Sequence, residues 1–312
     1  MDEIASERSE SVTTARGTIP HAPLVSVVLP TQNRVDLLKR AVESVFRQSV
    51  TDFELIIVDD ASRDGTKAYL ASVEMRDPRV RVVHIQTAVG GAGARNAGLH
   101  LCRGKWTAFL DDDDQWLPAK LQRQLEKLSA NSSAIACSCG YIRCLPSGRS
   151  KEVLVPSDAT MPRLLADSML GGASLCVCST RILGEIGGFD STLRSAQDMD
   201  LWVRLRQRGE IEVCREALVL YGVHIGPRIS TDMRAQYIGS RRFYFKHRNL
   251  MDERLRRRRV AYCCFIMSRE RSRSFRRRCY YLLLSLLHSA PRSSLAFARS
   301  SVPRILMDCI RT

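Results

Sequence analysis

The chain has 312 residues, of which 45% are apolar and 26% charged, a composition typical of globular rather than disordered proteins. Its net charge of +15 is concentrated at one end: residues 1–239 contain 29 basic and 29 acidic residues, whereas residues 240–312 contain 19 and 4. The clean apolar runs are shorter than the roughly 20 residues of a membrane-spanning helix, which argues against a transmembrane enzyme.

The N-terminus and the cysteines indicate a cytoplasmic protein. Residues 1–22 are polar, lack the basic and apolar segments of a signal peptide, and are predicted to form a disordered leader. The eleven cysteines are odd in number and include no Cys-x-x-Cys pair, so neither a disulfide framework nor a zinc site is expected. Reduced thiols are the simplest interpretation.

From residue 24 onward, apolar strands alternate with amphipathic helices. This alternation predicts an α/β fold with a doubly wound, mostly parallel sheet and flanking helices. Beyond residue 130 the alternation weakens, and from residue 240 the chain is Arg-rich and expected to be helical. The expected strands are 24–29, 55–58, 80–84, 106–110, 135–142 and 175–178, and the expected helices are 37–46, a segment after 59–66, 95–102 after a flexible glycine loop at 90–93, 118–128 and 199–207.

Three polar segments, at 30–33, 59–60 and 111–114, directly follow predicted strands. Ligands of open α/β sheets bind beyond the carboxyl ends of the strands, so we expect these segments on one rim. The four consecutive aspartates at 111–114 repel one another, and a hard divalent cation would relieve that repulsion. The alternative is a solvated acidic turn that caps the next helix, but the position after an apolar strand favours the metal.

Five segments, in the right order over residues 24–232, resemble glycosyltransferase family 2. Members of this family are inverting, nucleotide-sugar-dependent enzymes with the GT-A fold. The resemblance implies a GT-A domain at 23–239, followed by a basic helical C-terminal extension at 240–312. The segments are the opening strand and nucleotide loop (25–34), the Asp-Asp-x-Ser-x-Asp-Gly-Thr stretch (57–66), the Ala-Arg-Asn-x-Gly turn (93–98), the Asp-x-Asp metal motif (109–121) and the acceptor-side region (187–190 and 197–205).

For the nucleotide sugar, the resemblance implies five binding residues. Asp60 would hydrogen-bond the nucleobase, and Pro30 and Gln32 would line its pocket. Arg95 would pair with the base or phosphate side of the nucleotide, and Asp112 would contact the ribose or a nearby sugar. Gln32 stands where the family often has an aromatic residue, so the nucleobase preference stays open.

The resemblance also implies the metal site and the catalytic base. Asp111 and Asp113 would form the Asp-x-Asp pair that binds Mn²⁺ or Mg²⁺, and His224 would be a third metal ligand or a phosphate donor. For His224 the alternative is a loop histidine without a role. Asp198 would be the general base that takes the proton of the acceptor hydroxyl. Gln197 replaces the usual glutamate before this base.

The basic C-terminal extension leaves three alternatives open. Arginine clusters beside the apolar runs 260–267 and 280–287 suit an anionic lipid surface. The second alternative is that the extension is a helical appendage that packs on the catalytic domain. Nucleic acid fits the charge, but no recognised motif supports it. The protein is therefore expected to be cytoplasmic, with peripheral attachment to the inner face of the membrane as a further possibility.

The sequence thus predicts an inverting, metal-dependent glycosyltransferase. It would move a sugar from a nucleotide-diphosphate donor, UDP-linked by preference, to a hydroxyl of a glycan or lipid-linked saccharide in cell-envelope polysaccharide biosynthesis. A processive synthase is disfavoured because no Gln-x-x-Arg-Trp motif follows. The alternative is a non-catalytic protein that binds a membrane or nucleic acid through its basic surface and is built on a nucleotide-binding α/β domain.

Overall fold

The structure is a computed structural model, and it describes residues 22–145, 147–167, 169–222, 232–269, 277, 279–281 and 283–285. The leader predicted at 1–22 lies outside these residues except for residue 22. His224 and most of the predicted extension beyond residue 269 also lie outside them.

The first half of the chain alternates strands and helices, as the sequence predicts. Strand β1 is buried along its whole length, because helices cover both faces of this part of the sheet. The elements are β1 (Val25–Thr31), α1 (Val35–Phe46), β2 (Phe53–Asp60), α2 (Thr66–Arg76), β3 (Val80–Ile85), α3 (Gly90–Leu99) and β4 (Trp106–Phe109). Strands β3, β2, β1 and β4 are neighbours in that order, and all of their pairings are parallel.

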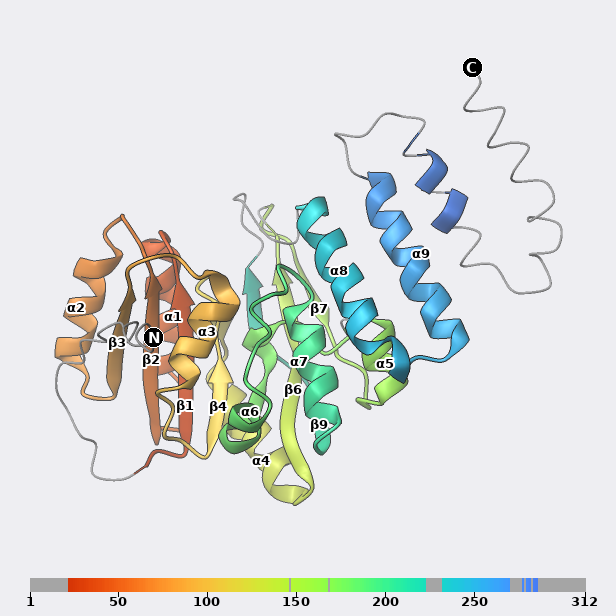
Figure 1. The fold of residues 1–312 in the computed structure, drawn as a ribbon. Coiled ribbons are helices and arrows are strands. Elements are labelled where there is room, and N and C mark those ends of the chain that lie inside the picture. Colours follow the sequence, from red (N-terminus) through yellow and green to blue (C-terminus); the bar gives the residue numbers. More distant parts are fainter. Residues whose placement is uncertain are drawn as a thin grey trace, which may run out of the picture.

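The second half continues the same sheet with antiparallel strands. Its elements are β5 (Gln115–Trp116), α4 (Lys120–Ala130), β6 (Ala134–Cys144), β7 (Ser150–Val153), α5 (Met161–Ala166), the 3₁₀ turn η1 (Ala173–Leu175), β8 (Val177–Ser179), α6 (Thr180–Glu185), α7 (Gln197–Arg206) and β9 (Glu210–Gly222). Strand β8 lies antiparallel between β4 and β6, whereas β9 runs parallel to β6. The nine-stranded sheet has the order β3-β2-β1-β4-β8-β6-β9-β5, with β7 on β6. Figure 1 shows β3, β2, β1 and β4 side by side.

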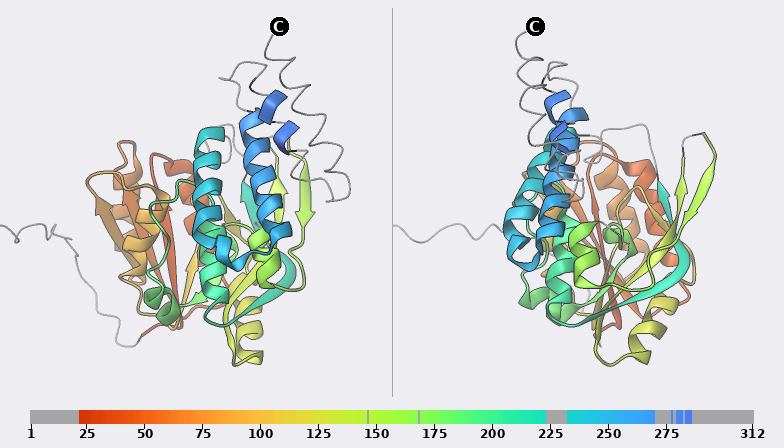
Figure 2. Two further views of the ribbon diagram at one scale, coloured as in Figure 1. Left: turned by 45° about the vertical axis from the view of Figure 1, so that its right-hand side comes forward. Right: turned by 90° about the vertical axis from the view of Figure 1, so that its right-hand side faces the viewer.

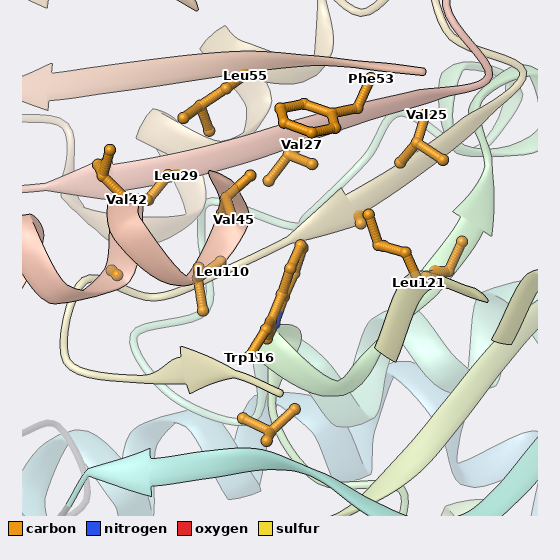
Figure 3. Packing of buried hydrophobic residues seen from close by; sticks show 14 of the residues in the cluster. Val25, Val27, Leu29, Val42, Val45, Phe53, Leu55, Leu110, Trp116 and Leu121 are labelled. Carbon is orange, nitrogen blue, oxygen red and sulfur yellow. The ribbon is translucent and has the colours of Figure 1, made fainter. Parts of the chain in front are cut away.

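Two apolar layers hold helices against the two faces of the sheet. On one face, α1, α2 and α4 pack through side chains such as Leu38, Leu70 and Leu121. Figure 3 shows Val45 and Leu121 of this cluster together with strand residues such as Val27. On the other face, Leu99 of α3 and Trp202 of α7 belong to a second cluster. Each fully buried aliphatic side chain contributes roughly 1.5–3 kcal/mol. Helices on both faces confirm the predicted doubly wound architecture.

The glycines predicted as a flexible loop at 90–93 instead form the first turn of α3. Gly90 has a φ of +77°, a conformation that L side chains rarely adopt, and this turns the chain into the helix. Further along, a Cβ on Gly98 would lie 2.4 Å from Cγ1 of Val28. The missing side chain lets α3 lie directly on β1, and this close approach sets the position of Arg95.

The C-terminal region is helical where it is described, as the sequence predicts. Helix α8 (Met233–His247) leads through the 3₁₀ turn η3 (Arg248–Leu250) to α9 (Glu253–Arg269), and the two helices lie side by side (Figure 2). Phe243 and Met251 belong to the second apolar cluster, so α8 packs on the sheet domain and crosses the boundary expected at residue 239. Among the helices of the described residues, none combines the length and the apolarity that crossing a membrane requires.

Candidate functional site

The carboxyl ends of β1, β2 and β4 meet at one rim of the sheet. Their parallel register sets Thr31 beside Asp59, and Val28 of β1 beside Phe109 of β4. The predicted polar segments 30–33, 59–60 and 111–114 therefore lie next to one another, as expected. Residues from α3, α7 and β9 complete this rim.

One side of the rim, which the sequence predicts to bind the nucleotide and which we call the nucleotide side, is built around Asp60. Its Oδ1 accepts from the backbone N–H of Val89 at 2.8 Å, and its Oδ2 accepts from that of Gly90 at 2.8 Å. The side chain of Gln32 is exposed, and its Nε2 donates to the carbonyl oxygen of Asp60 at 2.7 Å. Pro30 is buried near the end of β1. Because each carboxylate oxygen accepts more than one hydrogen bond, Asp60 retains capacity to contact a base.

Asp112 is tied to the loop after β1. Its Oδ2 accepts from Thr31 Oγ1 at 2.9 Å, and its Oδ1 accepts from an Arg34 guanidinium N–H at 3.1 Å. Burial raises the pKa of the Asp112 carboxyl to about 6, although the charge of Arg34 and the hydrogen bond from Thr31 oppose the rise. Arg34 also lies 3.6 Å from Oδ2 of Asp113. The sequence prediction assigned no role to Arg34, even though it is the last residue of the strand and nucleotide-loop segment 25–34.

Arg95 joins the nucleotide side to the acidic motif. Its buried guanidinium forms an ion pair with Asp111 and lies over the Phe189 ring, 5.2 Å from the centroid. Burial lowers the pKa of Arg95, but the charges of Asp111 and Asp198 outweigh burial and raise it, so the cation is firmly held. The backbone N–H of Asp111 donates to Ser174 Oγ at 3.0 Å, a contact for which the sequence gave no signal.

Asp198 lies in the first turn of α7, and its Oδ1 is enclosed without a hydrogen-bond partner among the described residues. Burial raises the pKa of this carboxyl to about 6, with the Arg95 charge opposing the rise and Asp111 adding to it. The backbone N–H of Ala173 donates to the same carboxylate. An enclosed, under-bonded carboxyl with a pKa near neutrality is suited to proton transfer.

Gln197, the departure from the family pattern, makes two contacts that explain the amide. Its Nε2 donates to the carbonyl oxygen of Leu193 at 2.6 Å, and its Oε1 accepts from Arg95 at 3.5 Å. An ionised glutamate could accept from Arg95 but could not donate to a carbonyl. The amide therefore fixes the turn that enters α7 without adding another negative charge.

The chemistry of the Asp-x-Asp pair fits a divalent cation. Asp111 and Asp113 are partly exposed carboxylates that flank the buried Asp112. The described residues contain no cluster of three metal-ligating side chains. Mg²⁺ and Mn²⁺ are commonly held by one or two carboxylates together with substrate phosphates. The carboxylates of Asp111 and Asp113 are therefore the type and number of protein ligands that such an ion requires. His224 lies outside the described residues, and its role as a ligand stays a prediction.

The end of β9 closes this corner of the site. The backbone N–H of Gly222 donates to Asp114 Oδ1 at 2.9 Å, and a Cβ on Gly222 would lie 2.0 Å from the carbonyl oxygen of Asp113. Burial raises the pKa of the Tyr221 hydroxyl, and the charges of Asp114 and Asp111 add to that effect. Burial also raises the pKa of Asp114 well above its usual value, and the charges of Asp111 and Asp113 add to it.

Two further sequence predictions concern Trp202 and the cysteines. Trp202, expected to pack in the core rather than bind sugar, is 2% exposed, and its Nε1 donates to the carbonyl oxygen of Gly171 at 3.2 Å. All ten cysteines of the described residues are free thiols, in agreement with the prediction of reduced cysteines.

Together, the GT-A-like sheet and the acidic rim define a glycosyltransferase. The model of the family described as "Glycosyl transferase family 2" matches residues 26–183, half of the chain, and the chain belongs to this family. It is 35% identical over 189 residues to the putative teichuronic acid biosynthesis glycosyltransferase TuaG of Bacillus subtilis (strain 168), covering 60% of this chain and 73% of TuaG.

The name of a second relative includes its donor and its acceptor. The chain is 35% identical over 191 residues to the Escherichia coli enzyme named UDP-Glc:alpha-D-GlcNAc-diphosphoundecaprenol beta-1,3-glucosyltransferase WfgD, covering 60% of this chain and 72% of WfgD. The relatives support the prediction of an enzyme over that of a non-catalytic binding protein.

Solved structures confirm the predicted GT-A fold. S. aureus TarS 1–349 in complex with UDP-GlcNAc superposes with a TM-score of 0.64 at 18% identity, covering 86% of this chain and 81% of that one. The mannosyltransferase PcManGT from Pyrobaculum calidifontis, in complex with GDP-Man and Mn2+, gives a TM-score of 0.61 at 16% identity, covering 92% and 81%. At these identities the likeness establishes the fold.

Proposed function

We propose that this protein is an inverting glycosyltransferase that transfers a sugar from a UDP-sugar to a hydroxyl of a glycan or lipid-linked saccharide in cell-envelope polysaccharide biosynthesis. The observation that carries the proposal is the position of Asp198 on the rim. Its Oδ1 is enclosed, and the charges of Arg95 and Asp111 act on its carboxyl. The names of TuaG and WfgD support the envelope role, and the WfgD name supports the UDP donor and the lipid-linked acceptor.

The nucleotide side would hold the donor. The loop of Pro30 and Gln32 would line the base pocket with Asp60, and Asp112 would contact the ribose or sugar. Arg95 would stabilise the negative charge that develops on the departing diphosphate, because it is already buried and held in place by Asp111. A divalent cation at Asp111 and Asp113 would supply further charge stabilisation when bound.

Asp198 would be the base of a single displacement. A sugar hydroxyl is a weak nucleophile until a positioned carboxylate accepts its proton, and such general-base catalysis contributes typically 10²–10⁴-fold. The O–H proton passes to Asp198, the hydroxyl oxygen bonds to the anomeric carbon, and the bond to the diphosphate breaks. One displacement inverts the anomeric centre, so no protein nucleophile is required.

A donor screen tests this function. UDP-glucose, UDP-N-acetylglucosamine and GDP-mannose are each incubated with the protein and Mn²⁺, and release of the nucleotide is measured with and without a short-chain GlcNAc-diphosphoryl lipid. We expect release with one UDP-sugar, stimulated by the lipid and abolished by chelation. Absence of release with all three donors would reject the proposed reaction.

For the membrane partner, the described part of the C-terminal helices carries the relevant surface. Phe245 is 50% exposed, Tyr262 44% and Phe265 39%, and the guanidinium groups of Arg248 and Arg269 lie over Phe245 and Phe265. Exposed rings beside cations suit the headgroup region of an anionic leaflet. This surface would bring the enzyme to a lipid-linked acceptor at the inner face of the membrane.

Vesicle co-sedimentation tests that attachment. The double variant F245S/F265S should lose binding to vesicles that contain phosphatidylglycerol, whereas M75S, which removes an 85% exposed methionine from α2, should bind as the unmodified protein does. Equal binding by all three proteins would reject this surface. Binding to RNA in place of vesicles would favour the nucleic-acid alternative.

A further inference from the structure

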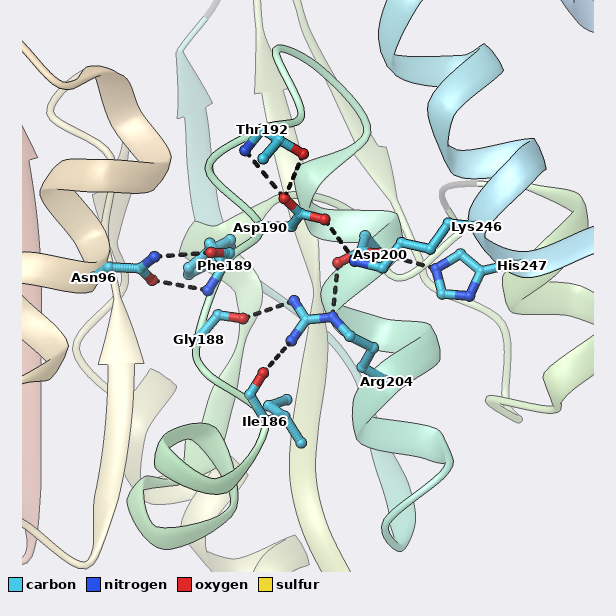
Figure 4. Close-up of polar contacts among 10 residues, drawn as sticks. All are labelled: Asn96, Ile186, Gly188, Phe189, Asp190, Thr192, Asp200, Arg204, Lys246 and His247. Atoms are coloured by element: carbon cyan, nitrogen blue, oxygen red, sulfur yellow. Dashed lines mark hydrogen bonds and ion pairs between the residues drawn. The ribbon is translucent and has the colours of Figure 1, made fainter.

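The buried carboxylate of Asp200 receives three donors on α7 and α8 (Figure 4). Arg204 Nε donates to its Oδ2 at 2.7 Å, and Lys246 Nζ lies 2.8 Å from its Oδ1. His247 Nε2 is also 2.8 Å from Oδ1, and it must carry the proton, because an ionised carboxylate only accepts. Burial acts to raise the pKa of Asp200, but the hydrogen bonds from His247 and Lys246 and the Arg204 charge outweigh it and lower the pKa to about 2.

Arg204 connects the Asp200 cluster to the turn at residues 186–188, where the predicted acceptor-side region 187–190 begins. Its other two guanidinium nitrogens donate to the carbonyl oxygens of Ile186 at 2.9 Å and Gly188 at 2.6 Å. Gly188 has a φ of +62°, and a Cβ there would lie 2.4 Å from Oδ1 of Asn96. The turn is thus locked from both sides, by α7 and by α3.

Asn96 carries the connection back to Arg95. Its side-chain amide donates to the carbonyl oxygen of Phe189 at 2.8 Å and accepts from the Phe189 N–H at 2.8 Å (Figure 4). The Phe189 ring lies under the Arg95 guanidinium and meets Phe109 edge-on, with ring centroids 5.0 Å apart. A continuous set of contacts therefore runs from Asp200 to the residue that grips Asp111.

Helix α8 fixes α7 at a second point. Gly239 of α8 lies so close to Ser195 that a Cβ would be 2.5 Å from the Ser195 carbonyl oxygen. Ser195 Oγ donates to the carbonyl oxygen of Ala235 at 3.1 Å. Ser195 immediately precedes Ala196, the N-cap residue of α7. The turn that bears Asp198 is thus held before it by Gly239 and after it by the Asp200 cluster.

We propose that Asp200 is a positioning residue for glycosyl transfer, and that Lys246 and His247 of α8 act through it to fix Asp198 against Arg95. This inference rests on the proposed role of Asp198 as the base. Asp200 itself would touch neither donor nor acceptor, since its side chain is fully enclosed and its partners come from α7 and α8. The C-terminal helix α8 is then part of the catalytic unit rather than an appendage.

The energetics of buried ion pairs favour positioning of α7, rather than stabilisation of the fold, as the role of the Asp200 cluster. Buried ion pairs are often replaceable by apolar side chains of similar volume without loss of stability, because desolvation offsets their attraction. What a satisfied polar network provides is one defined arrangement of the groups it joins. A misplacement of about 1 Å in a catalytic group can cost about 100-fold in rate, so a fixed first turn of α7 has a direct effect on turnover.

The test compares Asp200→Asn and Lys246→Met with the unmodified protein, using whichever of UDP-glucose, UDP-N-acetylglucosamine and GDP-mannose gives nucleotide release. Rates are divided by the number of UDP-binding sites counted by calorimetry, so that unfolded protein does not contribute. We expect kcat to fall about 10-fold or more in each variant, with the donor KM within about 2-fold, since the contacts of Asp60 and Asp112 lie outside the Asp200 cluster. The two changes share the Lys246–Asp200 contact, but Lys246 Nζ also lies 2.6 Å from Asp190 Oδ2, so the loss of rate in the double variant should be smaller than the product of the two single losses.

Asp167→Asn is the matched control, since it removes an exposed ion pair of 3.5 Å between the end of α5 and Arg258 of α9. It should leave kcat and KM unchanged. Amide hydrogen exchange of residues 193–200 should accelerate in Asp200→Asn and not in Asp167→Asn. Unchanged exchange, or faster exchange with normal kcat, would overturn the positioning role.

Asp198→Asn, measured in parallel, separates the two ideas. If it retains turnover, the proposed base is wrong, whatever Asp200 does. If it is inactive while Asp200→Asn has normal kcat, the proposed function stands and only the positioning role fails.

Discussion

The two sides of the rim hold their carboxylates in opposite ways. On the nucleotide side, Asp60 and Asp112 each have both oxygens bonded to nearby donors. On the acceptor side, one enclosed oxygen of Asp198 has no hydrogen-bond partner among the described residues, although Asp200, two residues further along the same helix, has three. On α7 the pKa differs in the same sense, at about 6 for Asp198 and about 2 for Asp200, whereas burial raises the pKa of Asp112 to about 6 although both of its oxygens are bonded. The proposed base is thus distinguished by an enclosed oxygen that no donor of the described residues occupies, rather than by its pKa alone.

The strongest test of this contrast is Asp198→Asn. The amide keeps the shape of the side chain but cannot accept the hydroxyl proton, so transfer should fall about 10³-fold. UDP binding by calorimetry should stay unchanged, because the nucleotide side is intact. Wild-type turnover in this variant would show that the acceptor side does not supply the base.

The next largest effect should come from Asp113→Ala. Loss of one carboxylate of the Asp-x-Asp pair should weaken Mn²⁺-dependent UDP binding and lower turnover about 100-fold, because the cation would stabilise the diphosphate charge. Asp36→Ala is the matched control, since this α1 carboxylate is exposed and pairs only with Lys39 in the contacts described. Equal UDP affinity with and without Mn²⁺ in the unmodified protein would remove the cation from the site.

The pH dependence should separate activity from stability. Below pH 6 the base is protonated, so kcat should fall about 10-fold per pH unit once well below its pKa of about 6. Stability should change in the opposite direction. A carboxyl whose folded pKa is raised, as in Asp198 and Asp112, contributes stability that is present below its unfolded pKa of 3.8 and lost as the pH rises through about 6.

Asp200 has the reverse sign. Its folded pKa of about 2 lies below the usual 3.8, so its contribution to stability is present above pH 3.8 and lost as the pH falls through about 2. Chemical denaturation between pH 2 and 7, with Asp200→Asn as comparison, measures this. If the variant and the unmodified protein lose stability in parallel below pH 4, the Asp200 cluster is not the acid-sensitive element.

The smallest expected effect is a loss of stability in Gly98→Ala, because Gly98 lets α3, which carries Arg95, lie directly on β1. Gly98→Ala would put a methyl group 2.4 Å from Val28, and overpacking of this kind costs about 1–3 kcal/mol of unfolding free energy. Gly184→Ala on α6 is the control, since nothing lies within 4 Å of its added methyl group. Urea denaturation should show a loss for the first and none for the second. Equal stability would mean that α3 moves away from β1 without cost.

The strand ends and their acidic residues were predictable because they are local patterns. The run Leu55 to Val58 followed by Asp59 and Asp60 indicates both a buried strand and a polar rim. In contrast, the Arg34–Asp112, Asn96–Phe189 and Asp200–His247 contacts join residues separated by 78, 93 and 47 positions. No local pattern encodes such a pairing, since it depends on how whole helices and loops pack.

The glycine loop at 90–93 shows the other limit of sequence reasoning. Three glycines among these four residues have low helix propensity and indicate a flexible turn, yet the segment forms the start of α3. Tertiary contacts decide here: Asp60 accepts the N–H groups of Val89 and Gly90, which are the first of the helix to need a partner. Asp60 thus caps α3 from a distant strand, a function that its predicted role at the nucleobase does not include.

Gly222 sets a boundary for redesign of this enzyme. Any side chain at this position would collide with the carbonyl of Asp113 and push β9 away from the acidic motif. Loops grafted from relatives to alter acceptor choice must therefore join the chain after a glycine here, or the graft will displace the Asp-x-Asp turn before it changes specificity.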